Sequence, residues 1–98
     1  MVGQMEASLM EKSEISHHEL RTYKALKSAT TWLTSREIAA QAKISPRTAR
    51  AHVTKFVNLG LIDVAEVFPG HRYRWSEKAD KRNAAYLKRL ERAMEVFG

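Results

Sequence analysis

A stretch near the middle of the chain has the apolar spacing of an amphipathic helix. Ala49, Val53 and Phe56 are four and then three residues apart, so they share one face of a helix. Ser45 precedes them and can cap the helix, because its hydroxyl can accept a hydrogen bond from a free amide of the first turn. Pro46 suits the next position, where an N–H group has no partner within the helix. The pattern therefore predicts a helix that begins at Ser45 and buries one face.

The other face of this predicted helix is basic. At 100° per residue it holds three cations and no acid, namely Arg47, Arg50 and Lys55, together with Ala51, Thr54 and Asn58. Residues 38–62 include four basic residues and no aspartate or glutamate. A solvated helix face usually mixes both signs, whereas a basic face on a helix that follows a tight turn is typical of duplex DNA binding.

A shorter helix is predicted just before this one. Thr34 and Glu37 fit a capping box, in which the threonine hydroxyl caps the Glu37 amide and the carboxylate reaches back to the Thr34 amide. Leu33 and Ile38 occupy the two positions of a hydrophobic staple. The small side chain of Ala42 allows close approach to the following helix. The two segments therefore predict a helix-turn-helix.

The run IAAQAKISPRTARAHVTKFVNLGLI resembles the helix-turn-helix of winged-helix bacterial regulators of the MarR and ArsR kind. The matching features are Ile38-Ala39, Ile44-Ser45, Thr48-Ala49, His52-Val53, Phe56 and Gly60-Leu61-Ile62. With a hairpin wing, the resemblance covers residues 16–76 and implies an α+β, mostly α, winged helix-turn-helix. It also implies a short strand within residues 29–33 that pairs with the hairpin. The family usually has glycine in the turn where this chain has Lys43, so a non-glycine residue is expected to adopt a positive φ there.

The helix before this motif is predicted to begin at Ser16. Ser16 and Glu19 fit another capping box, and Ile15 and Leu20 fit another hydrophobic staple. Leu20 and Tyr23 have the spacing of one buried face. The sequence thus predicts a third helix to pack against the helix-turn-helix.

Residues 61–75 are predicted to form a β-hairpin, which would be the wing. Apolar and polar residues alternate along its first strand, and Pro69-Gly70 is a turn signal in which the glycine supplies a positive φ. With a two-residue loop, Val64 faces Trp75, and Val67 lies opposite the second residue of the return strand.

The return strand of this hairpin has cations near its tip. Tyr73 and Trp75 lie on one face, and Arg72 and Arg74 lie on the other. We expect His71, Arg72 and Arg74 to contact DNA phosphate or the minor groove. The alternative is that Arg72 and Arg74 form a solvated strand face that pairs with Glu66 or Asp63 of the first strand.

A final helix is predicted over residues 77–98, with Ser76 as its cap. Its apolar positions form one stripe of Tyr86, Leu87, Leu90, Ala93, Met94 and Phe97. The expected core of the rest of the domain consists of Leu20, Tyr23, Ile38, Val53, Phe56, Val64 and Trp75, which leaves the stripe uncovered. The prediction is that the stripe pairs with the same helix of a second copy. The alternative is that it folds back on the first helix of its own chain.

Composition is consistent with one small basic domain. The 98 residues have a formal charge of +6 and a pI near 9.9, which favours a polyanionic partner. There is no cysteine, so disulfides and thiolate metal sites are excluded. Without a long apolar run or a signal peptide, a cytoplasmic location and no membrane contact are expected. The expected organisation is a flexible arm (1–14), a winged helix-turn-helix (15–76) and a dimerisation helix (77–98), with a helical arm on a partner subunit as the alternative for 1–14.

The leading hypothesis is a sequence-specific, double-stranded DNA-binding transcriptional regulator that acts as a homodimer, with the helix of residues 45–59 in the major groove. The predicted DNA-binding residues are Lys43, Ser45, Pro46, Arg47, Thr48, Arg50, Ala51, Thr54, Lys55, His71, Arg72 and Arg74. The alternative is a winged-helix protein-interaction module in a larger assembly. No nucleophile or acid–base pair stands out, so no catalytic residue is expected. No cofactor or metal is expected either, and the only faint metal candidates are His17, His18, Glu91 and Glu95.

Overall fold

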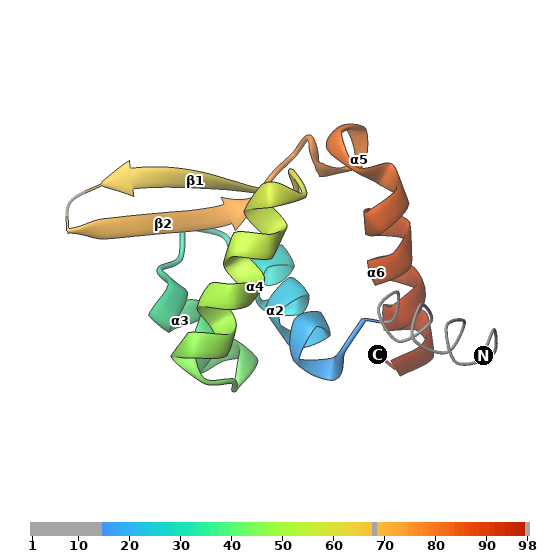
Figure 1. Ribbon diagram of the computed structural model, residues 1–98, viewed down its shortest axis with the longest axis horizontal. Helices are drawn as coiled ribbons and strands as arrows, with labels where there is room; N and C mark the ends of the chain where they lie inside the picture. The colour runs from blue at the N-terminus through green and yellow to red at the C-terminus, as the bar shows by residue number, and fades with distance from the viewer. Residues whose placement is uncertain (1–14, 68, 98) are drawn as a thin grey trace, which may run out of the picture.

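The computed structural model describes residues 15–67 and 69–97, so the predicted arm of residues 1–14 lies outside the described residues. The elements, in chain order, are α2 (His17–Ser28), α3 (Ser35–Ala42), α4 (Pro46–Asn58), β1 (Ile62–Val67), β2 (Gly70–Trp75), α5 (Ala79–Arg82) and α6 (Ala84–Phe97). Helices α2, α3 and α4 form the body of the domain. The hairpin extends from one side of that body, and α5 and α6 lie on the other (Figure 1). This is the predicted mostly helical winged helix-turn-helix.

The core lies where α2, α3 and α4 meet the base of the hairpin. Leu26, Ile38 and Phe56 are among its fully buried side chains. Every residue of the predicted core lies in or against this cluster except Val64, which is 40% exposed. That prediction was wrong because β1 continues beyond the body of the domain, where no helix covers its inner face.

The helix-turn-helix forms through the predicted local contacts. The Thr34 hydroxyl accepts from the Glu37 amide at 3.1 Å, and the Glu37 carboxylate accepts from the Thr34 amide at 2.8 Å, which completes the capping box. Lys43 follows α3 with φ 59° and ψ 47°, so the left-handed turn expected from the resemblance is confirmed. The Ser45 hydroxyl accepts from the Thr48 amide at 3.1 Å and caps α4.

The end of α4 is a Schellman motif. Gly60 has φ 80°, its amide donates to the Val57 carbonyl, and the Leu61 amide donates to the Phe56 carbonyl. A Cβ atom at Gly60 would lie 3.1 Å from the Cβ atom of Arg82, so both the backbone angle and the space favour glycine. This turn directs the chain from α4 into the hairpin.

The hairpin register differs from the prediction by two residues. Val64 pairs with Tyr73, Val67 pairs with Gly70, and Trp75 pairs with Ile62, so the connection between the strands is residues 68–69. Gly70 is the first residue of β2 and is not among the described residues with positive φ. The observed register places Trp75 at the base of the hairpin, with ring centroids 5.1 Å from Tyr23 of the core. Because side chains alternate with a period of two, an even shift leaves every residue on its predicted face.

The short strand expected before α3 is reduced to one bridge. The Leu33 amide donates to the Tyr73 carbonyl at 2.8 Å, and the Tyr73 amide donates to the Leu33 carbonyl at 2.7 Å. This pair joins the entry of the helix-turn-helix to the return strand of the wing.

The predicted single C-terminal helix is two helices with a break at Asn83. The Asn83 side chain accepts from the Tyr86 amide at 3.1 Å and donates to the Leu59 carbonyl at 3.2 Å. Asn83 therefore caps α6 and anchors it to the end of α4. The prediction that Ser76 caps the helix was wrong, because its hydroxyl accepts from the Lys78 amide in the turn before α5.

Helix α6 packs on α2 of its own chain, as in the alternative considered for it. Leu90 is fully buried and Tyr86 nearly so, and Leu87, Ala93 and Met94 pack partly against the core. The premise that the whole stripe needs a second copy was therefore wrong. Phe97 is 56% exposed and lies against His17, with ring centroids 4.9 Å apart.

Candidate nucleic-acid interface

The outward face of α4 is the predicted basic face. Arg47, Arg50, Ala51, Thr54 and Asn58 are all exposed on it. The opposite face is buried and consists of Ala49, Val53 and Phe56. The amphipathic orientation inferred from the spacing is thus confirmed, and α4 lies at the surface of the domain rather than within it (Figure 1).

Four cations near this face have no carboxylate partner within residues 15–67 and 69–97. They are Lys43, Arg47, Arg50 and Arg72, and none of their side chains takes part in an ion pair or a hydrogen bond there. Lys43, Arg47 and Arg50 are exposed, and Arg72 is half-buried. A surface cation without an intramolecular partner can neutralise an external phosphate without first breaking an ion pair. This absence of internal neutralisation is the main electrostatic property of the α4 surface.

The first turn of α4 already uses its hydroxyl groups. Ser45 donates to Thr48 Oγ1 at 2.9 Å while it accepts from the Thr48 amide. Pro46 is exposed at the first helical position. The guanidinium groups of Arg47 and Arg50 are therefore the stronger candidates for contacts with DNA bases.

Lys43 lies at the basic edge between α2 and α3. Its side chain lines a shallow cleft together with Arg21 and Lys24 of α2, and no acidic residue lines that cleft. The turn that leads into α4 therefore has an excess of positive charge, which suits contact with a phosphate backbone.

Two of the three predicted wing residues have partners within the domain. Arg74 lies 3.8 Å from an Asp63 carboxylate oxygen, and its guanidinium stacks 4.5 Å from the ring centroid of Trp32. His71 lies 3.8 Å from a Glu66 carboxylate oxygen. The alternative of a paired strand face, which concerned Arg72 and Arg74, thus describes Arg74. Arg72 is the wing cation without an ion pair in the described chain.

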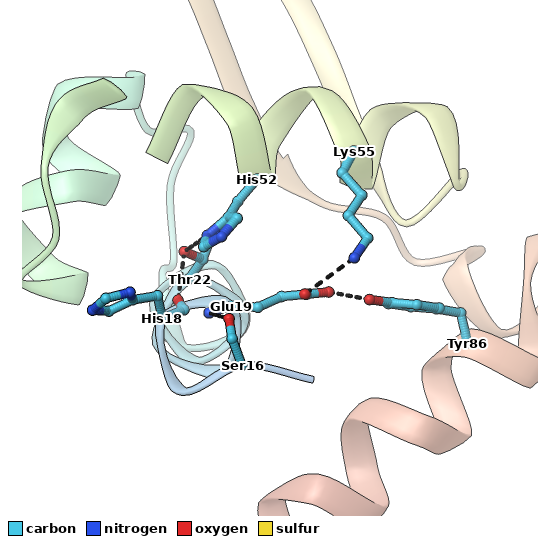
Figure 2. A network of polar contacts seen from close by, with 7 residues as sticks. All are labelled: Ser16, His18, Glu19, Thr22, His52, Lys55 and Tyr86. Atoms are coloured by element: carbon cyan, nitrogen blue, oxygen red, sulfur yellow. Dashed lines mark hydrogen bonds and ion pairs between the residues drawn. The ribbon is translucent and has the colours of Figure 1, made fainter. Parts of the chain in front are cut away.

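Lys55 reaches from α4 toward Glu19 of α2 (Figure 2). Its ammonium lies 3.1 Å from Glu19 Oε1 and 5.2 Å from the ring centroid of Tyr86. The Tyr86 hydroxyl donates to the other oxygen of Glu19. The buried Glu19 carboxylate thereby connects α2, α4 and α6 through one residue of each helix.

This contact also corrects the predicted cap of α2. The Ser16 hydroxyl accepts from the Glu19 amide at 3.1 Å, as expected. The Glu19 carboxylate does not return to the Ser16 amide, because Lys55 and Tyr86 bind both of its oxygens. Only half of the predicted capping box forms.

The surroundings of this cluster change the pKa of two members. Burial raises the pKa of Tyr86, and its hydrogen bond to Glu19 raises it further. Burial alone would lower the pKa of Lys55, but its interactions with Tyr86 and Glu19 outweigh burial and raise it. Both shifts favour a neutral tyrosine and a charged lysine.

His52 joins α4 to α2 on the same flank. Its Nδ1 atom lies 2.9 Å from Thr22 Oγ1, and the Thr22 hydroxyl donates to the His18 carbonyl at 3.0 Å (Figure 2). Since a hydroxyl has one proton, His52 donates from Nδ1 to Thr22. His52 is therefore a packing residue of the α2–α4 contact.

This position predicts an acid-sensitive stability. Burial lowers the pKa of His52 below its ordinary value of 6.5. Below that value the unfolded chain binds a proton that the folded chain binds less readily, so the free energy of unfolding should decrease as the pH falls below 6.5. Urea unfolding from about pH 7.5 to 5.5 should show a smaller decrease for His52→Gln than for the parent or for His71→Gln, in which an exposed histidine is replaced. An equal decrease in all three proteins would show that His52 is not the source of the acid sensitivity.

The roles of two residues that hold α4 in place were missed in the sequence, each for a different reason. Glu19 was assigned to a cap, although it shares the buried face of Thr22 and Leu26 at a spacing of three and four residues. That spacing was the available signal. Asn83 is a good capping residue within a helical pattern, and a polar cap at that point could have indicated the break before α6.

The faint metal candidates do not come together. Among the described residues, no group of three or more histidine, aspartate or glutamate side chains could hold a metal ion. Within the same part of the chain, no helix has both the length and the apolar character needed to cross a bilayer.

No protein-family model matches the chain, and no curated protein matches its sequence. Several solved structures are similar to it. A MarR family protein from Bacillus stearothermophilus has a TM-score of 0.56 and 16% identity, over 97% of this chain and 72% of that one. Lactococcus lactis ZitR in complex with DNA has a TM-score of 0.54 and 17% identity, over 98% of this chain and 77% of that one.

The same fold occurs within a larger protein. Human N-acetylserotonin methyltransferase has a TM-score of 0.56 and 23% identity, over 69% of this chain. The chain spans only 20% of the methyltransferase. At such identities the similarity concerns the fold alone. Together with the observed elements, it shows that the chain has the winged helix-turn-helix fold found in MarR-type regulators.

Proposed function

We propose that the protein is a sequence-specific, double-stranded DNA-binding transcriptional regulator, with α4 in the major groove. The observation that carries the proposal is the exposed face of α4, where Arg47 and Arg50 have no carboxylate partner in the described chain. The major groove admits an α-helix, and recognition helices contact bases mainly through their N-terminal turns. Both arginines lie in the first two turns of α4.

The residues of this face fit different roles. Arg47 and Arg50 are proposed to bind guanine through two hydrogen bonds each. Ala51 and Thr54 are proposed to lie against the edges of bases, where a thymine methyl group offers an apolar contact. Lys43 is proposed to bind a phosphate from the turn, where it shares a basic edge with two cations of α2.

The first turn and the wing are proposed to position the domain on the duplex. Ser45, Pro46 and Thr48 lie at the start of α4, where backbone and hydroxyl groups can approach a phosphate. In the wing, Arg72 is proposed to be the principal phosphate or minor-groove contact. His71 and Arg74 are proposed as secondary contacts, because each would have to leave an internal carboxylate.

Replacement of Arg72 tests the role of the wing. Arg72→Ala is expected to weaken binding to all duplex sequences about equally and to lower the salt slope by about one unit. Arg74→Ala is the comparison on the same strand face, and it should have the smaller effect because Asp63 already neutralises part of its charge. Fluorescence anisotropy with labelled duplexes at several salt concentrations would measure both. A loss confined to one sequence would contradict a phosphate contact.

A homodimer remains part of the proposal, with a different contact from the stripe first expected. Val96 and Phe97 are exposed at the end of α6, and they are the large apolar residues there that the domain leaves uncovered. Pairing through this end would give two α4 helices for two half-sites. Sedimentation of the parent and of a Val96→Asp, Phe97→Asp variant would test it. A monomeric parent at tens of micromolar ends the dimer proposal and leaves the assignment of α4 intact.

An alternative is a winged helix used only as a protein-interaction module. The salt dependence of binding to random duplex DNA separates the two functions, because phosphate neutralisation gives a steep and linear dependence on the logarithm of salt concentration. Selection from a random duplex pool should also yield one enriched sequence for a specific regulator. Absence of both results would favour the module. The similarity to one fifth of a methyltransferase concerns the fold and supplies no reaction for this chain.

A further inference from the structure

We infer that Glu19 acts as an internal competitor of DNA, because it holds the Lys55 ammonium that would otherwise bind the phosphate backbone. The inference rests on the proposed function and concerns the same helix, α4. It names a buried carboxylate on α2 as a positioning residue for DNA affinity.

The Lys55 side chain can reach either the Glu19 carboxylate or a DNA phosphate. It lies eight residues after Arg47, which places it roughly 80° around the helix axis from the centre of the basic face. Its side chain remains 45% exposed while its ammonium contacts Glu19. A flexible four-carbon stem at this flank can therefore turn inward to the carboxylate or outward to a phosphate.

The burial of Glu19 favours its ion pair with Lys55. Its side chain is only 6% exposed, so the carboxylate lacks the hydration of a surface acid. Lys55 is the cation that contacts it in the described chain, and Tyr86 supplies one neutral hydrogen bond. Removal of Lys55 would leave a buried charge with a single donor, which proteins strongly disfavour. DNA that drew Lys55 outward would have to overcome this loss, so in the parent protein Lys55 contributes little to DNA affinity.

Tyr86 links this competition to α6. Its hydroxyl donates to the Glu19 oxygen that Lys55 does not contact (Figure 2). Asn83 anchors the same helix to the end of α4. Release of Lys55 therefore disturbs the cluster that joins α6 to the recognition helix. By linkage, whatever strengthens the Glu19–Lys55 contact weakens DNA binding, and DNA binding weakens that contact.

Glu19→Gln is the direct test. Glutamine keeps a hydrogen-bond acceptor for Tyr86 but loses the charge that holds Lys55. Binding to a random duplex should become about eightfold tighter at 0.1 M salt, and the salt slope should steepen by about one unit, as expected for one additional released counterion. Glu77→Gln is the matched control, because Glu77 is exposed and its replacement changes the net charge by the same amount.

Lys55→Gln and the double variant show whether the gain passes through Lys55. Lys55→Gln alone should change affinity by less than about twofold, since the side chain is already held by Glu19. In the Glu19→Gln background, the same replacement should remove the eightfold gain. Equal effects of Lys55→Gln in both backgrounds would overturn the inference.

Tyr86→Phe separates release of Lys55 from loosening of α6. This variant removes a donor to Glu19 but keeps the carboxylate charge, so Lys55 should stay bound and DNA affinity should not rise. If Tyr86→Phe and Glu19→Gln raise affinity equally, the gain comes from loosening α6 and the inference is wrong. Circular dichroism and urea unfolding of each variant confirm that folded proteins are compared. A parent without salt-dependent duplex binding would instead contradict the proposed function itself.

Discussion

Arg47→Ala and Arg50→Ala are each expected to weaken binding to a selected DNA site by about 1–3 kcal/mol and to relax specificity at one base pair per half-site. Both side chains are exposed in the first two turns of α4, and neither has a carboxylate partner in the described residues. A guanidinium that forms two hydrogen bonds with one guanine distinguishes that base from the other three. Its loss should therefore affect the selected site more than random DNA.

The measurement is a competition titration of each variant against the selected site and against every single-base substitution of that site. Arg92→Ala is a matched control, because Arg92 is exposed on α6 and its loss changes the net charge equally. The control should lose little affinity and no specificity. If both α4 variants bind the selected site as tightly as the parent, the assignment of α4 to the major groove is wrong.

Leu90→Ala is expected to destabilise the folded protein by about 2–5 kcal/mol, the range observed for truncation of buried leucine. Leu90 is fully buried, and α6 packs on α2 of the same chain. Had the stripe formed a dimer contact, as its spacing suggested, the main effect would be on oligomeric state. Its burial within one chain makes the expected effect a loss of folding stability.

Phe97→Ala is the comparison on the same helix. Phe97 is 56% exposed, and its ring lies against that of His17. Its truncation should therefore change the free energy of unfolding by less than about 1 kcal/mol. Urea unfolding followed by circular dichroism would measure both free energies. Similar values for the two variants would mean that α6 does not dock through Leu90.

Features determined by neighbouring residues were predictable from the sequence. The capping box at Thr34 and Glu37 and the Ser45 cap of α4 depend on chemistry within one turn of helix, whereas the left-handed Lys43 was expected from the family resemblance. The buried and exposed faces of α4 also followed from spacing alone. These features define the candidate recognition surface, which explains why its position was predicted well.

Features that depend on distant partners were not predictable in the same way. The hairpin register depends on how Trp75 packs against Tyr23. The turn signal at Pro69-Gly70 suggested a loop one residue later than the observed one, which changes the strand pairing by two residues. The predicted strand faces were still correct, because the register shift is an even number of residues. The break at Asn83 depends on the Leu59 carbonyl, which lies 24 residues earlier in the chain.

The role of Lys55 shows the same limit within the candidate site. Its position on the helix predicted an outward cation, and nothing near it in the sequence indicates an acidic partner. Glu19 lies 36 residues earlier and is buried only because α2 packs between α4 and α6. A one-signed stretch of sequence therefore overstated the charge that the folded surface presents, by this one lysine.

The most direct test of the central claim is to map the surface that binds duplex DNA. Backbone amide resonances of the labelled protein would be followed by NMR while a short random duplex is added at low salt. The proposed function predicts that the largest shifts fall at Arg47, Arg50 and Thr54 of α4, with smaller shifts at Arg72 of the wing. Shifts centred on α6, or no shifts at a protein concentration where salt-dependent binding should be saturated, would contradict a recognition role for α4.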